Sequence, residues 1–219
     1  MSLAPGQQLL EVLAAVVLVT SWISLVHRRV AALVRLYAAQ SAAMAAVAGL
    51  VAYLYNAPIL YLTGATIFGL NAVLIPTVLL RLQRDLRVPD EVNMLVSVRT
   101  SGLAGLGCLL LAVAVVGPLT PYAEIPAAGL LPISVTVVLI GLFLTSTRRK
   151  AFTQVIGMLV MANGVFLAGL ALTFGLGLLL ELGVAANLLI LAIVGRLFLF
   201  RMKDSFDTVD ADALRALEG

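Results

Sequence analysis

The sequence predicts an all-α fold, a polytopic transmembrane bundle of seven helices with the N-terminus outside and the C-terminus in the cytoplasm. Its 219 residues are 62% hydrophobic and 11% charged, whereas about a quarter of the residues in a soluble domain are charged. Its apolar segments run to about twenty residues and are separated by short breaks, as expected for helices that cross a bilayer. Lys and Arg residues cluster at alternate segment ends, which sets the orientation.

Residues 1–147 are expected to hold the four to five N-terminal transmembrane helices. Basic residues break the chain after the first span, and Asn56 with Pro58 marks the turn after the second. Pro76 removes a backbone donor inside the third span, so a kink is expected near Ala72 to Pro76. The expected spans are 9–26, 30–55, 59–80, 102–117 and 128–144.

The segment 81–100 is the most charged part of the chain and is expected to be a cytoplasmic loop. Within it, Pro89 is followed by Asp90 and Glu91, a pattern typical of a helix start. The sequence therefore predicts a short interfacial helix from Glu91 to Val98.

Residues 148–203 are expected to form the final two transmembrane helices, and residues 204–219 an acidic cytoplasmic tail. The N-terminus and the loops after spans two, four and six contain no Lys or Arg. We interpret the basic clusters as cytoplasmic anchors at the lipid bilayer and not as a nucleic-acid site. The candidate anchors are Arg28, Arg29, Arg148, Arg149 and Lys150.

The chain offers few residues for catalysis or ligand binding. His27 is the single histidine and Cys108 the single cysteine, so neither a metal-ligand cluster nor a nucleophilic triad is supported. Its glycines form no phosphate-binding pattern. We therefore expect no enzyme activity, catalytic residue, metal or cofactor in this chain.

Polar residues inside apolar spans each need an explanation, because unpaired polar groups are costly in hydrocarbon. The simpler interpretation is that each polar side chain makes an interhelical hydrogen bond of roughly 0.6 to 2 kcal/mol. For Glu181 the simpler interpretation is an interfacial carboxylate that faces water. The alternative is a hydrated proton or ion path. The candidates for such a path are Gln40, Asn71, Asn163, Glu181 and Asn187.

Small residues in the sixth span fall close to one helical face, given about 100° per residue. Such a face accepts a close-packed partner helix, and the sequence leaves open whether that helix is internal or in another subunit. The predicted packing face is Gly157, Gly164, Ala168, Ala171 and Gly175.

Several segments of the chain are similar to those of one known family. They are RRKAFTQVIGMLVMANGVFLAGLALTFG, LLLELGV, the tail ending FDTVDADALRALEG, and the earlier LVRLYAAQS and NAVLIPTVLLRL. Together they resemble the hydrogenase-4 component E (HyfE-like) family, membrane subunits of group 4 nickel–iron hydrogenases and related complex I-like assemblies. The C-terminal part, beginning near residue 101, is also similar to the NuoK-type subunit of complex I and the C-type subunit of Mrp antiporters.

The chain departs from this family at its ionisable positions. Ala162 stands where the family has an intramembrane glutamate, Asn71 where a lysine is common, and Asn187 where an acid is common. Losing an acid and a base together leaves no unpaired buried charge. Alanine cannot carry a proton, so the resemblance implies membership in the complex more than proton transfer.

The resemblance implies a non-catalytic membrane-arm subunit of an energy-converting complex in a prokaryotic cytoplasmic (inner) membrane. Its expected partners are antiporter-like membrane subunits and an anchoring subunit, with any nickel–iron or iron–sulfur centre in a partner chain. One alternative is a direct proton or Na⁺ conductor that uses Glu181 and the neutral polar residues. A weaker alternative is an independent small transporter.

Overall fold

The computed structural model describes residues 5–85, 90, 95–118 and 130–173. Of these residues 91% are helical and none forms a strand, so the prediction of an all-α fold is confirmed. Six helices of the described part are long and apolar enough to cross a membrane. The predicted seventh helix, the acidic tail and the positions of both termini lie outside the described residues.

The helices follow the predicted order with small shifts at their ends. In chain order they are α1 (Pro5–Val26), α2 (Val30–Leu54), α3 (Ile59–Thr66), the π-helix η1 (Ile67–Leu74), α4 (Ile75–Asp85), α5 (Val98–Val116), α6 (Leu130–Thr147) and α7 (Ala151–Thr173). The α3, η1 and α4 segments together make one continuous membrane-length helix, 59–85.

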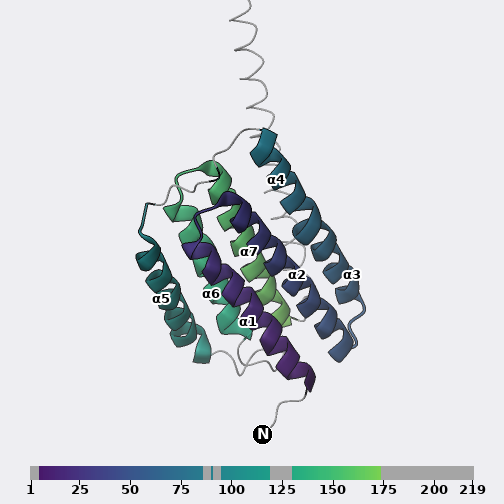
Figure 1. Cartoon of the computed structure of the whole chain (residues 1–219). Coiled ribbons are helices and arrows are strands. Elements are labelled where there is room, and N and C mark those ends of the chain that lie inside the picture. The colour runs from purple at the N-terminus through teal and green to yellow at the C-terminus, as the bar shows by residue number, and fades with distance from the viewer. Residues whose placement is uncertain (1–4, 86–89, 91–94, 119–129, 174–219) are drawn as a thin grey trace, which may run out of the picture.

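Four helices form the centre of the bundle, and two units pack on its sides (Figure 1). Helix α1 packs on α2 and α6, and α7 packs on α6 and α2. Helix α5 lies against α1 and α6, while the α3–η1–α4 unit contacts α2. We call α1, α2, α6 and α7 the central helices, and α5 and α3–η1–α4 the outer units.

Local chemistry explains the turns between these helices. The turn after α2 contains Asn56 with a φ of 51°, a left-handed conformation that asparagine adopts more readily than most residues. Pro58 follows at the position before α3, where its fixed φ suits a helix start. Ser97 caps α5, since its hydroxyl accepts from the Thr100 backbone N–H.

The region before Pro76 is a π-helix, where the sequence predicted a kink. It spans Ile67–Leu74, and the Ile75 N–H donates to the carbonyl of Leu70, five residues earlier. A proline cannot donate to the preceding turn, and a π-helical stretch is one way for a helix to absorb that break. Asn71 lies in this stretch.

The predicted loop at 81–100 is partly helical, which corrects two sequence-based boundaries. Residues 81–85 continue α4, and residues 98–100 already belong to α5. The interfacial helix predicted from Glu91 to Val98 is wrong over 95–97, which are not helical. Residues 91–94 lie outside the described part. Ser97 caps α5, so the helix in this region begins at Val98 and not at Glu91.

Candidate functional site

A hydrogen-bonded polar cluster lies in the middle of the central helices. Gln40 Nε2 donates to Ser21 Oγ at 2.7 Å. Asn163 Nδ2 donates to Gln40 Oε1 at 3.3 Å and to Ser41 Oγ at 3.1 Å. Ser21 Oγ in turn donates to the Val17 carbonyl at 2.7 Å. We call Ser21, Gln40, Ser41 and Asn163 the central polar cluster.

This cluster is neutral and lies deep in the bundle. All four side chains are 3% exposed or less, and they come from α1, α2 and α7. With a rise of about 1.5 Å per residue, Gln40 lies roughly 15 Å along α2, near its midpoint. The bonds link three helices, and each of them joins uncharged groups. The cluster therefore holds no titratable carboxylate or amine.

Asn71 lies apart from this cluster, on the outer side of α2. Its side chain is 3% exposed, and its Oδ1 has no hydrogen-bond partner among the described residues. The Tyr37 hydroxyl on α2 is likewise buried without a partner there; it lies beside Ser41 but outside hydrogen-bonding geometry. These atoms are the unsatisfied polar groups of the membrane-spanning helices in the described part.

The α6–α7 contact is made at backbone distance through glycines. A Cβ placed on Gly164 would lie 2.7 Å from the Val138 backbone nitrogen, and one on Gly157 would lie 2.7 Å from that of Thr145. From the other side, a Cβ on Gly141 would lie 2.5 Å from the Met161 nitrogen. Helix α6 of the same chain therefore occupies this part of the predicted packing face.

The other members of that predicted face are less uniform. Ala171 is fully buried and Ala168 is half-buried. Gly175 lies outside the described residues.

Arg148 has a different role from the surface anchor predicted for it. Its side chain is 3% exposed, and its Nη2 donates to the carbonyls of Ser24 and Leu25, both at 3.1 Å. It therefore satisfies carbonyls at the C-terminal end of α1. Burial lowers the pKa of Arg148 to about 10, so the guanidinium remains charged at neutral pH.

Asp90 provides a second connection at the same end of the bundle. Its backbone carbonyl accepts from the Val30 N–H at 2.8 Å, and its Oδ1 accepts from the Ala31 N–H at 3.0 Å and from Gln83 Nε2 at 3.1 Å. These bonds cap the start of α2, where Arg29 makes no side-chain cap. The bond from Ala31, assisted by Gln83 and by nearby Arg29 and Arg35, lowers the pKa of Asp90.

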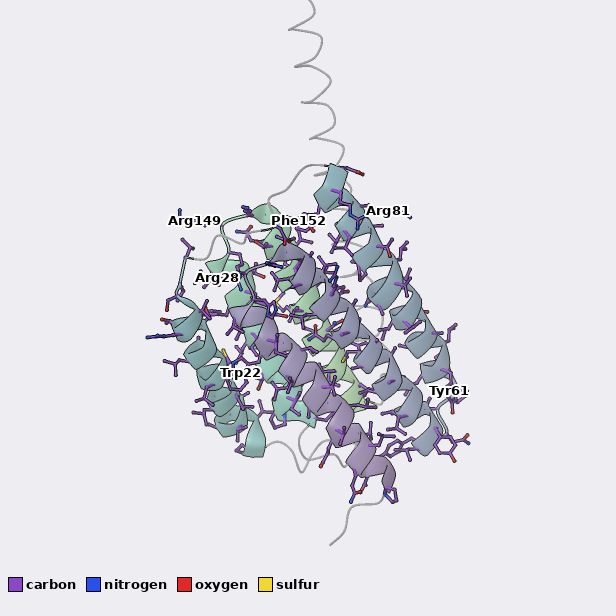
Figure 2. The ribbon with its side chains drawn as sticks, viewed as in Figure 1. Trp22, Arg28, Tyr61, Arg81, Arg149 and Phe152 are labelled. Carbon is purple, nitrogen blue, oxygen red and sulfur yellow. The ribbon has the colours of Figure 1, made fainter. Side chains whose placement is uncertain are left out.

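The remaining predicted anchors lie at this same end. Arg28, Arg29 and Arg149 are exposed, and Lys150 is half-buried. Figure 2 shows Arg28, Arg81 and Arg149 gathered at one end of the bundle and Tyr61 near the other. Such a charge distribution is typical of a helix bundle with one cytoplasmic end.

The structure thus brings together two of the predicted polar residues, Gln40 and Asn163, and keeps Asn71 separate. Glu181 and Asn187 lie outside the described residues. Ala162, next to Asn163, is half-buried and packs against the apolar core. No group of three or more His, Cys, Asp or Glu side chains in the described part could hold a metal ion.

Sequence reasoning missed several residues that position the site. Ser21 was not singled out, although it is a hydroxyl in an apolar helix and such residues often bond between helices. Gly141 was missed because it is a lone glycine without a small-residue pattern around it. The inward direction of Arg148 has no sequence signal, because Arg148 and Arg149 are adjacent and of the same type.

Comparison with known proteins identifies a curated relative of this chain. Uncharacterized protein Rv0085 of Mycobacterium tuberculosis is 33% identical over 207 residues, which cover 94% of this chain and 91% of that protein. No family model matches the chain. No solved structure matches it either.

Proposed function

The chain belongs to the same family as Uncharacterized protein Rv0085, and we propose that it is a non-catalytic membrane-arm subunit of a group 4 hydrogenase-like or complex I-like energy-converting complex. In this proposal it is a seven-helix protein of a prokaryotic cytoplasmic membrane, with the N-terminus outside and the C-terminus in the cytoplasm. The HyfE-like resemblance of its segments motivates the choice of complex.

The observation that carries the non-catalytic role is the neutrality of the central polar cluster. Its members bond to one another side chain to side chain, and Arg148 is the one charged residue among the buried side chains of the described part. Arg148 lies between α6 and α7 at the basic end of the bundle, not at mid-depth. Neutral bonds between helices support a scaffolding role better than proton transfer, which requires groups that titrate.

The outer units supply surfaces for neighbouring subunits in this proposal. Along α5 the side chains of Leu103, Leu110 and Val115 are 69%, 62% and 61% exposed. On the other flank, Leu62 and Phe68 are 66% and 53% exposed. Both flanks are apolar, so each suits either lipid or a membrane-embedded partner such as an antiporter-like subunit.

Co-purification from the native membrane tests this function. The tagged chain, extracted in a mild detergent, is expected to carry antiporter-like subunits and a soluble redox subunit that holds nickel–iron or iron–sulfur centres, identified by mass spectrometry. Deleting the chain should leave those subunits as smaller particles on native gels. Recovery of a stable chain that transports ions alone would contradict the proposal and favour an independent small transporter.

Direct proton or Na⁺ conduction is a second candidate, favoured by the unsatisfied Asn71 and Tyr37 atoms within the membrane. Glu181 would be its titratable residue. Glu181→Gln in the assembled complex separates the two functions: unchanged ion pumping with normal assembly supports scaffolding. Lost pumping with normal assembly supports conduction, since the variant removes the proton-binding group and keeps the side-chain shape.

A further inference from the structure

Two polar atoms remain unsatisfied where α2 faces the α3–η1–α4 unit. The Tyr37 hydroxyl and Asn71 Oδ1 are each buried, with side chains 1% and 3% exposed, and neither has a hydrogen-bond partner among the described residues. Water cannot reach such atoms from the hydrocarbon, and leaving them unpaired is costly. A polar molecule held inside the protein would remove that cost.

The packing register brings these atoms to the same depth. Helices α2 and α3 are consecutive and antiparallel (Figure 1), and a Cβ on Gly64 would lie 3.1 Å from the Ala45 carbonyl and 3.5 Å from Ala48 Cβ. Counting back along α2 and forward into η1 from that contact places Asn71 opposite the turn that carries Ser41. Tyr37 is one turn before Ser41 on the same helix face.

The donors and acceptors define what can bind there. Asn71 Oδ1 only accepts, a tyrosine hydroxyl both donates and accepts, and Ser41 Oγ already accepts from Asn163 Nδ2. A molecule with two donors and an acceptor fits this set. A bare divalent cation does not, because it requires more oxygen ligands and charge compensation.

We propose that Tyr37, Ser41 and Asn71 bind one internal water molecule between α2 and η1. The water donates to Asn71 Oδ1 and to Ser41 Oγ and accepts from the Tyr37 hydroxyl. Asn71 lies on the π-helix η1. Irregular helix segments of this kind are often found at functional sites. This water joins the α3–η1–α4 unit to the central polar cluster, and the proposal is independent of which complex the chain enters.

An experimental structure of the full chain in a lipid nanodisc, at a resolution that shows ordered water, tests the site directly. The expected result is a single density peak within 3.5 Å of both Asn71 Oδ1 and the Tyr37 hydroxyl oxygen. A direct hydrogen bond between those two atoms would overturn the proposal. So would a direct hydrogen bond from the Tyr37 hydroxyl to Ser41 Oγ, or bonding of either atom to a protein side chain from outside the three residues.

Thermal unfolding of variants gives a second test. Tyr37→Phe and Asn71→Leu are each expected to lower the apparent Tm by about 2 to 4 °C, and the double variant by no more than the larger single effect, because one bridge is lost once. Thr66→Val is the matched control, since Thr66 is half-buried and its hydroxyl donates to the Leu62 carbonyl within its own helix. Single variants that leave Tm unchanged or raise it would mean that the two atoms are simply unsatisfied and that no water bridges them.

Discussion

The central helices and the outer units are held in different ways. In the most apolar 18-residue stretch of each helix, 67% of the residues are buried in α7 but only 17% in α5. Helix α7 contacts α6 at backbone distance and reaches α2 through Asn163. On α5, a Cβ on Gly105 would meet the side chains of Leu25 and Trp22, while a Cβ on Gly107 would meet nothing within 4 Å.

This difference shows how the chain distributes its small and polar residues. Lipid is as apolar as leucine, so helices in a membrane associate through close packing and hydrogen bonds instead of the hydrophobic effect. The central helices have both. Of the outer units, α3–η1–α4 approaches α2 closely at Gly64, and α5 exposes apolar side chains instead. Close packing and hydrogen bonds therefore hold α1, α2, α6 and α7 together, and the outer units present exposed apolar side chains to their surroundings.

The largest expected effect comes from enlarging a central glycine. Gly164→Leu would force the side chain against the Val138 backbone, so we expect a loss of about 3 kcal/mol or more in the free energy of unfolding. The measurement is unfolding in mixed detergent micelles followed by circular dichroism. Gly107→Leu on α5 is the control and should change stability by less than about 0.5 kcal/mol. Equal effects at both sites would remove the distinction between central and outer helices.

The buried guanidinium gives the next largest effect. Arg148→Ala leaves the carbonyls of Ser24 and Leu25 without their donor, and we expect a loss of about 2 kcal/mol. The same micelle unfolding assay applies. Arg149→Ala is a control adjacent in sequence, with the same chemistry but an exposed side chain. If the two variants behave alike, Arg148 acts as an ordinary surface anchor.

Breaking the central polar cluster should have a moderate effect. Asn163→Leu removes the donor to Gln40 and Ser41, and interhelical bonds in membranes contribute about 0.6 kcal/mol each on average. We therefore expect a loss of about 1 kcal/mol. Combining it with Gln40→Leu in a double-mutant cycle should show coupling, because the two side chains share a bond. Strict additivity would show that the cluster does not act as a unit.

The smallest effect concerns the attachment of the α3–η1–α4 unit to α2. Asp90→Asn keeps an acceptor oxygen for Ala31 and Gln83 but removes the charge at the start of α2, so we expect a loss of about 0.5 kcal/mol at pH 7. Because the folded state lowers the pKa of Asp90 below its ordinary value of 3.8, this contribution is present above pH 3.8 and declines as the pH falls below it.

The pH dependence of the difference between the wild type and Asp90→Asn provides the check. Asp85→Asn, an exposed acid close by on α4, should show no such loss at pH 7. A difference between wild type and Asp90→Asn that persists unchanged to pH 2 would show that the carboxylate charge plays no part in the cap.

Much of the architecture was predictable, because it follows from properties that are local in sequence. Apolar length and the break at Arg28 and Arg29 predicted α1 and α2 to within a few residues. The partners of individual side chains were not predictable. Asn163 needed a hydrogen bond, but nothing along the chain indicates that Gln40 and Ser41 lie next to it, because that depends on how α2 and α7 pack.

The same limit explains the two errors at the basic end. Pro89 with Asp90 reads as a helix start, yet Asp90 instead caps α2 from a distance and Ser97 starts α5. Arg148 and Arg149 are indistinguishable in a sequence, but one turns inward to α1 and the other outward. Tertiary contacts decided both cases, against an equally plausible local pattern.

The bond from Arg148 to α1 also constrains the order of biogenesis. Ser24 and Leu25 are made early, and Arg148 is separated from them by 124 and 123 residues. Until that arginine leaves the ribosome, the end of α1 must keep its carbonyls hydrated at the membrane surface. Contacts between such distant residues form late. We therefore expect the pair α1 and α2 to enter the bilayer early and to reach its final position only after α6 has been inserted.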